Sequence, residues 1–196
     1  MTEEDFRLRP ATVDDAPQLA RLIDIAGEGI PSWLWQKSAE GNQTPLDIGT
    51  ERAKRPSGGF SYRNAVVATL SGQTIGMVLS YPIDAAPEDD PDDLPDPIAP
   101  FVALENGSVG TWYVNALAVL PGYRGTGAGT LLMRHAEELA RGAGYNRMSI
   151  QVYGQNTGAT RLYGRLGYEQ VDAAPVRQHP CQPYYTGDVL LLTRDI

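Results

Sequence analysis

Apolar and polar residues alternate in several short stretches of this chain, which is the spacing of a strand with one buried face. Glycine, proline and other turn residues bound these stretches, and Ser-Gly-Gln at 71–73 is typical of a hairpin connection. The predicted strands span residues 6–10, 64–70, 74–81, 109–119, 148–152, 168–171 and 187–193.

Apolar residues at intervals of three and four predict the helices. Thr12 or Asp14 can cap the first helix, and Pro17 suits its first turn. The predicted helices span residues 12–26, 30–35, 45–54, 127–143 and 157–166. In the longest of them, the side chains expected to face the sheet are Leu131, Leu132, Ala136, Leu139 and Ala140.

Residues 82–100 show no apolar periodicity and contain six prolines among acidic residues. Proline lacks a backbone N–H, so this segment is predicted to be a loop. Seven acidic residues between Asp84 and Asp96 account for most of the net charge of -8. The loop is either a solvated excursion or a lid or partner surface beside a binding site.

Size and composition favour a cytoplasmic protein with a single domain, residues 1–196. No apolar run approaches the ~20 residues that span a bilayer, and the acidic N-terminus lacks the features of a signal peptide. The lone Cys181 excludes an internal disulfide, and it does not form a zinc site with the dispersed His135 and His179. We expect no metal, no membrane segment and, given the negative charge, no nucleic-acid partner.

The turn after the 109–119 strand has the features of an anion site. It carries Arg124 and three alternating glycines, Gly125, Gly127 and Gly129, and it leads directly into the longest predicted helix. Backbone N–H groups at a helix N-terminus converge on one point, and the helix dipole favours negative charge there. Glycine omits the Cβ that would hold a pyrophosphate away from the backbone, so the turn is predicted to bind phosphate.

The spacing of this turn excludes two common nucleotide-binding motifs. No lysine follows Gly129, as the triphosphate P-loop requires, and Thr130 stands where the dinucleotide motif needs a glycine. Arg124, Gly127 and Gly129 do match Arg/Gln-x-x-Gly-x-Gly/Ala. This pattern resembles motif A of the GNAT acyltransferases, which bind the pyrophosphate of acetyl-CoA.

A second stretch, residues 156–169, resembles GNAT motif B, Asn-x-x-Ala-x-x-Leu-Tyr-x-x-Leu-Gly-Phe/Tyr. It predicts a short helix with Asn156 at its N-cap and Gly167 as its left-handed stop. Tyr163 alone would be interpreted as a core aromatic residue. In this motif it is a candidate general acid.

The resemblance implies an α/β fold, with a mixed, mostly antiparallel sheet of six to seven strands flanked by helices. In the family, acetyl-CoA sits where the fourth and fifth strands splay apart, and unpaired backbone groups there bond the pantetheine amides. The residues implied to contact acetyl-CoA are Leu117, Ala118, Val119, Arg124, Gly125, Thr126, Gly127, Ala128, Gly129, Thr130, Asn156 and Tyr163.

The implied reaction is direct attack of a primary amine on the thioester of acetyl-CoA, the co-substrate. Tyr163 would protonate the leaving thiolate, and the N–H of Leu117 would meet the oxyanion. A nucleophilic role for Cys181 is not required, because no covalent enzyme intermediate forms.

The general base is left open by the sequence. Many family members carry Glu or His on the fourth strand, whereas here Tyr113, Asn115 and Leu117 share the face that points into the acceptor cleft. Tyr113 and Asn115 are expected to contact the acceptor. Glu105, an acid of the 84–96 segment, His179 and a chain of water molecules are the alternatives for the base.

We expect the acceptor to be a primary amine of a small molecule, and the acidic 84–96 segment favours a cationic one. A protein N-terminus or lysine side chain is the alternative acceptor. A non-catalytic acyl-CoA-binding protein of the same fold is the alternative from another class. Trp33–Trp35 and the last strand offer surfaces for a homodimer contact.

Overall fold

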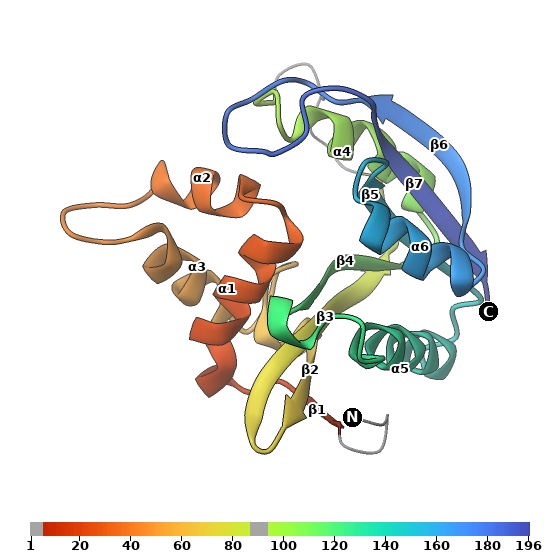
Figure 1. The fold of residues 1–196 in the computed structure, drawn as a ribbon, viewed down its shortest axis with the longest axis horizontal. Helices are drawn as coiled ribbons and strands as arrows, with labels where there is room; N and C mark the ends of the chain where they lie inside the picture. Colours follow the sequence, from red (N-terminus) through yellow and green to blue (C-terminus); the bar gives the residue numbers. More distant parts are fainter. Residues whose placement is uncertain (1–5, 87–93) are drawn as a thin grey trace. The chain divides into compact units, whose positions relative to one another are not determined.

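The computed structural model describes residues 6–86 and 94–196 (Figure 1). Its seven strands are hydrogen-bonded in the order β1-β2-β3-β4-β5-β7-β6, with β4 and β5 parallel. The predicted mixed α/β sheet is therefore confirmed. The chain divides into two compact units, which are described separately: unit 1 is Met1–Ser80 with Asn115–Ala136, and unit 2 is Tyr81–Val114 with Glu137–Ile196.

The strands are β1 (Arg7–Pro10), β2 (Ala65–Leu70), β3 (Gln73–Ile83), β4 (Thr111–Val119), β5 (Arg147–Tyr153), β6 (Glu169–Pro175) and β7 (Asp188–Asp195). The α-helices are α1 (Ala16–Ala26), α2 (Ile30–Gln36), α3 (Pro45–Ala53), α4 (Ala99–Glu105), α5 (Ala128–Gly142) and α6 (Thr157–Arg165). Short 3-10 turns span Val13–Asp15, Tyr62–Asn64, Asn106–Ser108 and Pro121–Tyr123.

Unit 1 places an antiparallel β1-β2-β3 ladder beside helices α1, α2 and α3. The predicted hairpin between β2 and β3 is confirmed, and Ser71 and Gly72 both have positive φ there, 50° and 81°. Trp35 of α2 is almost fully buried, and its ring lies so close to Gly49 of α3 that any side chain at position 49 would overlap it. The large apolar residues Leu19, Leu22 and Ile23 on α1 complete this core.

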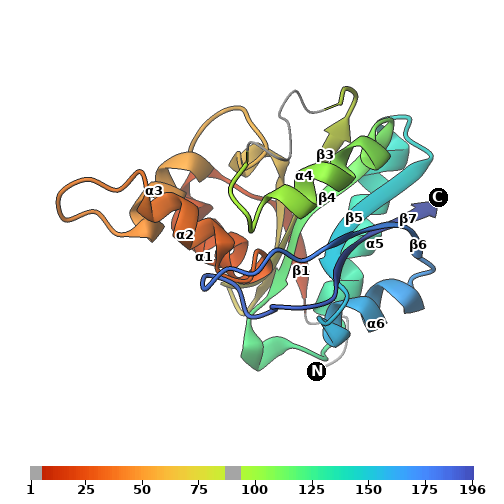
Figure 2. The same ribbon diagram turned by 90° about the horizontal axis from the view of Figure 1, so that it is seen from above.

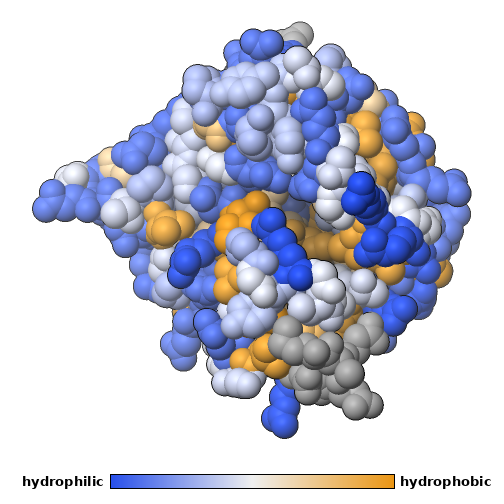
Figure 3. All heavy atoms as spheres, viewed as in Figure 1, coloured by the Kyte–Doolittle hydropathy of each residue, from blue (hydrophilic) through white to orange (hydrophobic). Residues whose placement is uncertain are grey.

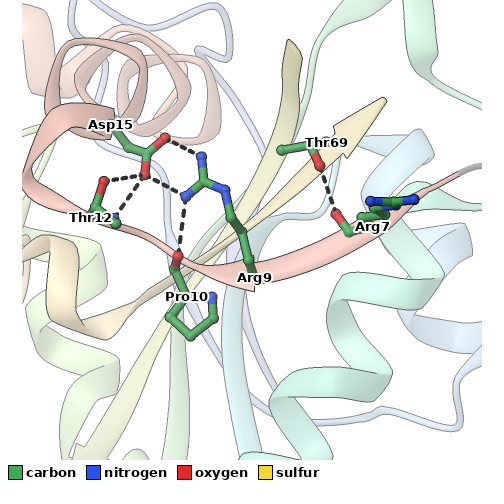
Figure 4. A network of polar contacts seen from close by, with 6 residues as sticks. All are labelled: Arg7, Arg9, Pro10, Thr12, Asp15 and Thr69. Carbon is green, nitrogen blue, oxygen red and sulfur yellow. Dashed lines mark hydrogen bonds and ion pairs between the residues drawn. The ribbon is translucent and has the colours of Figure 1, made fainter. Parts of the chain in front are cut away.

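A polar network fixes the chain between β1 and α1 (Figure 4). Both carboxylate oxygens of Asp15 accept from the Arg9 guanidinium at 2.7 Å, and Oδ2 also accepts from the backbone N–H of Thr12 at 2.8 Å. These hydrogen bonds lower the pKa of Asp15, with Arg9 the main cause and Thr12 a smaller one. Thr12 caps the 3-10 turn that leads into α1, in a capping box with Asp15, and Asp15 itself occupies the N-cap of α1 in place of Asp14.

Unit 2 places the last strand, β7, between β5 and β6, and both pairings are antiparallel. β4 joins β5 through the parallel pairs from Trp112↔Met148 to Val114↔Ile150. Helix α4 packs against β6 and β7 (Figure 2). On α5, the buried Glu137 accepts from Arg194 of β7, so its charge is paired inside the fold.

Two sequence-based predictions are wrong in detail. The predicted 82–100 loop is too long at both ends: residues 82–83 still belong to β3, and residues 99–100 begin α4, because Pro100 sits in the first turn of the helix, where no N–H is needed. Leu139 was expected to face the sheet but is 40% exposed, while Glu137 is buried on α5 instead. Residues 87–93 of the predicted loop lie outside the described part of the chain.

The visible surface is mostly polar, with apolar side chains in separate patches (Figure 3). Within residues 6–86 and 94–196, no helix has the length and apolar character needed to cross a bilayer. The exposed large apolar residues include Val13, Leu46, Val109, Leu139, Val171 and Tyr185.

Candidate functional site

The predicted anion-binding turn lies wholly within unit 1, at the end of β4. The Nε–H of Arg124 donates to the carbonyl of Val119 at 3.1 Å, and the Thr126 hydroxyl donates to the carbonyl of Tyr123 at 2.7 Å. The first bond uses one of the five N–H groups of the guanidinium. The turn is therefore fixed to the strand end while the exposed Arg124 keeps further donors for an anion.

Gly125 and Gly127 give the turn its shape, because their φ angles of 76° and 96° lie in the left-handed region that other residues rarely adopt. Helix α5 starts directly after them at Ala128. The first-turn N–H groups, including those of Ala128, Gly129 and Thr130, have no intrahelical carbonyl to bind. The fold thus presents donors and the positive end of a 15-residue helix dipole at this turn.

Leu117, Ala118 and Val119 form the last three residues of β4, directly before the turn. Ala118 is buried, whereas Leu117 and Val119 are half-buried, as alternation along a strand requires. Asn115 lies in the same part of unit 1 and is also half-buried. The predicted contacts of these residues with acetyl-CoA or the acceptor stay predictions.

In unit 2, Asn156 stands at the N-cap of α6, as predicted. Its Oδ1 accepts from the backbone N–H of Ala159 at 3.1 Å, and its own N–H donates to the carbonyl of Tyr153 at 2.9 Å. Gly167 ends this helical segment with φ of 83°, which confirms the predicted left-handed stop. These two residues set the start and end of the segment that carries Tyr163.

Tyr163 is buried, with only 4% of its surface exposed. Burial raises the pKa of its hydroxyl above the ordinary tyrosine value, so the group keeps its proton at neutral pH. Its ring lies 6.0 Å from the ring of Tyr168. A hydroxyl that stays protonated is suited to donate a hydrogen bond or a proton to a thiolate.

Tyr113 lies in unit 2 on the first half of β4 and is also buried. Its ring is 6.0 Å from that of Tyr81, at an angle of 76°. Burial raises the pKa of the Tyr113 hydroxyl well above its usual range, with Tyr81 and Glu105 adding to the shift. Tyr113 is therefore a neutral hydrogen-bonding group and not a base.

The alternative bases occupy different surroundings. Glu105 is the last residue of α4, and its charge acts on Tyr113. The Nδ1 of His179 accepts from the backbone N–H of Cys181 at 3.1 Å, which engages one ring nitrogen. In the acidic segment, Asp84 accepts from the Tyr145 hydroxyl and Asp96 pairs with Arg177, while residues 87–93 lie outside the described ranges.

Gln151 of β5 was not identified from the sequence. Among the described residues, neither its Oε1 nor its Nε2 has a hydrogen-bond partner, although both atoms are buried. Buried polar atoms in proteins are nearly always paired, so such an amide points to an additional ligand. The available signal was a single amide between the apolar residues Ile150 and Val152 of a predicted strand.

One cavity of about 580 Å³ lies in unit 1 at the exposed end of β1 and β2, and none of the predicted site residues lines it. Its lining residues are Arg7, Leu8, Arg9, Thr69, Ser71 and Gly72.

Comparison with known proteins establishes the family. A family model described as "Acetyltransferase (GNAT) family" matches residues 29–168, which is more than half of the chain. The chain therefore belongs to the GNAT family of acetyltransferases. Within this family, acetyl-CoA is the co-substrate, in agreement with the anion-binding turn at Arg124–Thr130.

Individual relatives are similar over shorter stretches or at low identity. Streptothricin acetyltransferase from Streptomyces lavendulae is 38% identical over 55 residues, which cover 28% of this chain and 29% of that protein. The chain thus matches less than a third of the length of this curated relative.

Solved structures match nearly the whole fold. A polyamine N-acetyltransferase from Drosophila melanogaster, described as forming N-acetylagmatine, has a TM-score of 0.69 at 17% identity and covers 98% of this chain and 100% of its own. The protein yncA from Salmonella typhimurium, solved with its cofactor acetyl-CoA, has a TM-score of 0.64 at 16% identity, and the match covers 97% of this chain and 94% of yncA. Likeness at this identity shows the fold alone.

Proposed function

We propose that this protein transfers an acetyl group from acetyl-CoA to a primary amine of a small molecule. The observation that carries the proposal is the turn from Arg124 to Thr130, where two left-handed glycines open directly into the N-terminus of α5. Such a turn suits the pyrophosphate of a coenzyme A thioester. The small-molecule acceptor is supported by the relatives, one of which acetylates streptothricin by name and another a polyamine.

Each predicted residue has a defined part in this proposal. The turn holds the pyrophosphate, and the backbone at Leu117 and Val119 bonds the pantetheine amides. The N–H of Leu117 also meets the carbonyl oxygen as it becomes negatively charged. Asn156 contacts the pantetheine arm, and Tyr113 and Asn115 contact the acceptor.

The reaction needs three proton movements. The acceptor reaches the enzyme as an ammonium ion and must lose a proton to His179, to an acid of the 84–96 segment or to water before its nitrogen can attack. The C–N bond forms as the C–S bond breaks, Tyr163 gives its proton to the thiolate, and the second proton that the nitrogen loses after attack restores the Tyr163 hydroxyl. The products are an acetamide and free coenzyme A, and one proton is released overall.

Thiol release tests the proposal. The full chain is incubated with acetyl-CoA and a panel of small primary amines, and free thiol and acetylated product are measured. Tyr163→Phe is expected to lower kcat by about 10²-fold, the usual contribution of a general acid, without changing the Kd for acetyl-CoA.

Tyr168→Phe is the matched control, because it removes a hydroxyl from the neighbouring ring, and that hydroxyl is buried with no hydrogen-bond partner among the described residues. Its kcat should equal that of the unmodified protein. Tight binding of acetyl-CoA without acetylation of any amine would show a non-catalytic binder instead. Full activity of Tyr163→Phe would remove Tyr163 as the acid.

A further inference from the structure

Tyr113, Ser149, Gln151 and Tyr153 lie on one face of the strands in unit 2. Tyr113 pairs with Ser149 in the parallel β4–β5 ladder, and paired residues share a face. Alternation along β5 places Gln151 and Tyr153 on the same side as Ser149. The face therefore carries two tyrosine rings with an amide between them.

Helix α4 and the segment before β7 supply further rings to this face. The ring of Tyr153 lies 5.3 Å from that of Phe101 on α4, at 88°, and 4.9 Å from that of Tyr184. The Tyr153 hydroxyl donates to Oε1 of the buried Gln182 at 2.8 Å, which fixes the ring in place. Tyr153 is buried, while Phe101 and Tyr184 are half-buried, so the ring cluster extends to the surface.

Gln151 gives this face an unusual polar feature. It follows directly after Ile150, the last β5 residue paired with β4, and it stands opposite Leu191 of β7. Leu191 lies against Gly107, just beyond α4, which places α4 on the same side as Gln151. Within the described residues, the buried amide has no partner, so a ligand with N–H groups would supply the hydrogen bond that its Oε1 lacks.

Negative charge reaches the same face from α4. Glu105 ends that helix half-buried, and its charge is one of the causes that raise the pKa of Tyr113. Aromatic faces, a carboxylate and an amide oxygen all attract a positively charged group. Together they stabilise a cation more strongly than any of them would alone.

A site that stabilises a cation does not suit the nitrogen that attacks. The reacting amine must be neutral, and a carboxylate with ring faces would hold it in the ammonium form. These groups are suited to a second cation that stays charged throughout the reaction. In the acceptor, an aliphatic chain that packs along the rings would separate this second cation from the reacting amine.

We propose that this face of unit 2, formed by Gln151, Glu105 and the rings of Tyr113, Phe101 and Tyr153, binds the non-reacting cationic end of a diamine or guanidino-amine acceptor. The inference rests on the proposed acetyl transfer and names its substrate class. Gln151 accepts a hydrogen bond from the cation through Oε1. Glu105 supplies the opposite charge, and the rings cover the aliphatic chain.

Calorimetric titration tests this site without requiring turnover. Three probes of similar length are titrated into the protein saturated with coenzyme A: 1,4-diaminobutane, n-butylamine and 4-aminobutanoate. The first should bind at least tenfold more tightly than the other two. Gln151→Leu should weaken its binding at least tenfold, whereas Gln151→Glu, which keeps an accepting oxygen and adds a negative charge, should bind it at least as tightly as the unmodified protein.

Gln155→Leu is the matched control, because Gln155 is an exposed glutamine whose amide donates to Thr186. It should leave diamine binding unchanged. Equal binding of 1,4-diaminobutane and n-butylamine, or equal binding by Gln151→Leu and the unmodified protein, would overturn the inference. Loss of diamine binding in Gln151→Glu would overturn it as well, because Nε2 would then be the atom that matters.

Thiol release with the same three amines separates this inference from the proposed function. Selective diamine binding without any acetylation would support the cation site and contradict the acetyltransferase. Acetylation of all three amines at equal kcat/KM would support the acetyltransferase and contradict the cation site.

Discussion

Replacing Gly76 of β3 with alanine is expected to destabilise unit 1. A Cβ at this position would lie 2.8 Å from the carbonyl oxygen of Ala118, 3.2 Å from Val119 and 3.4 Å from Leu132. The nearest of these atoms belongs to the backbone of β4 and cannot rotate away. Forcing an extra methyl group into such a contact costs about 1–3 kcal/mol. Alanine recovers about 0.4–1 kcal/mol through the less flexible unfolded chain. The net loss in the free energy of unfolding should be about 1–2 kcal/mol.

Gly142→Ala is the matched control for Gly76→Ala. Gly142 ends α5, and no heavy atom lies within 4 Å of the position of its added Cβ, so the change should stabilise the protein by about 0.5–1 kcal/mol. Urea unfolding at neutral pH measures both variants. Because Ala118 directly precedes the strand end that holds Arg124, Gly76→Ala should also weaken coenzyme A binding severalfold in a calorimetric titration. Equal stability of the two variants would refute the close packing of β3 against β4.

Two further predictions concern the anion-binding turn and the Arg9–Asp15 network. Gly127→Val and Gly144→Val each place a branched side chain at a positive φ, 96° and 88° respectively, so each variant should lose about 1–3 kcal/mol of stability. Only Gly127→Val should also weaken coenzyme A binding, by tenfold or more. Unchanged affinity would argue against the turn as the pyrophosphate site. Asp15 has a lowered pKa, so its stabilising effect is present above about pH 4 and is lost as the pH falls further. Asp15→Asn should therefore lower the free energy of unfolding by about 1–2 kcal/mol at pH 7, a value that is kept small by the 43% exposure of the Arg9 side chain. Near pH 2 the loss should be much smaller, and urea unfolding at both pH values measures the difference. An equal cost at both pH values would contradict the ionic role of Asp15.

The elements that follow a local rule were predictable from the sequence. Alternation identified the hairpin strands, and positive-φ requirements placed Gly167 at the end of the α6 segment. Asn156 was assigned as an N-cap because its side chain satisfies a backbone donor only a few residues away. These features depend on neighbours in sequence, which a single chain displays directly.

The features that were missed depend on contacts between distant residues. Glu137 is buried on α5 because Arg194, 57 residues later, pairs with it, and the helical pattern alone favoured Leu139 as the packed residue. Helix α4 was hidden by Pro100, because proline breaks a helix in its interior but fits its first turn. The unpaired amide of Gln151 depends on three-dimensional surroundings that no spacing reveals.

The interior position of β7 has a consequence for how unit 2 forms during synthesis. β5 and β6 each pair with β7, at Ile150↔Leu192 and Gln170↔Leu192. Until residues 188–195 leave the ribosome, both strands expose unpaired backbone edges. Emergence of residues 188–195, and not the earlier emergence of the turn at Arg124–Thr130, is therefore the step that allows this half of the sheet to close.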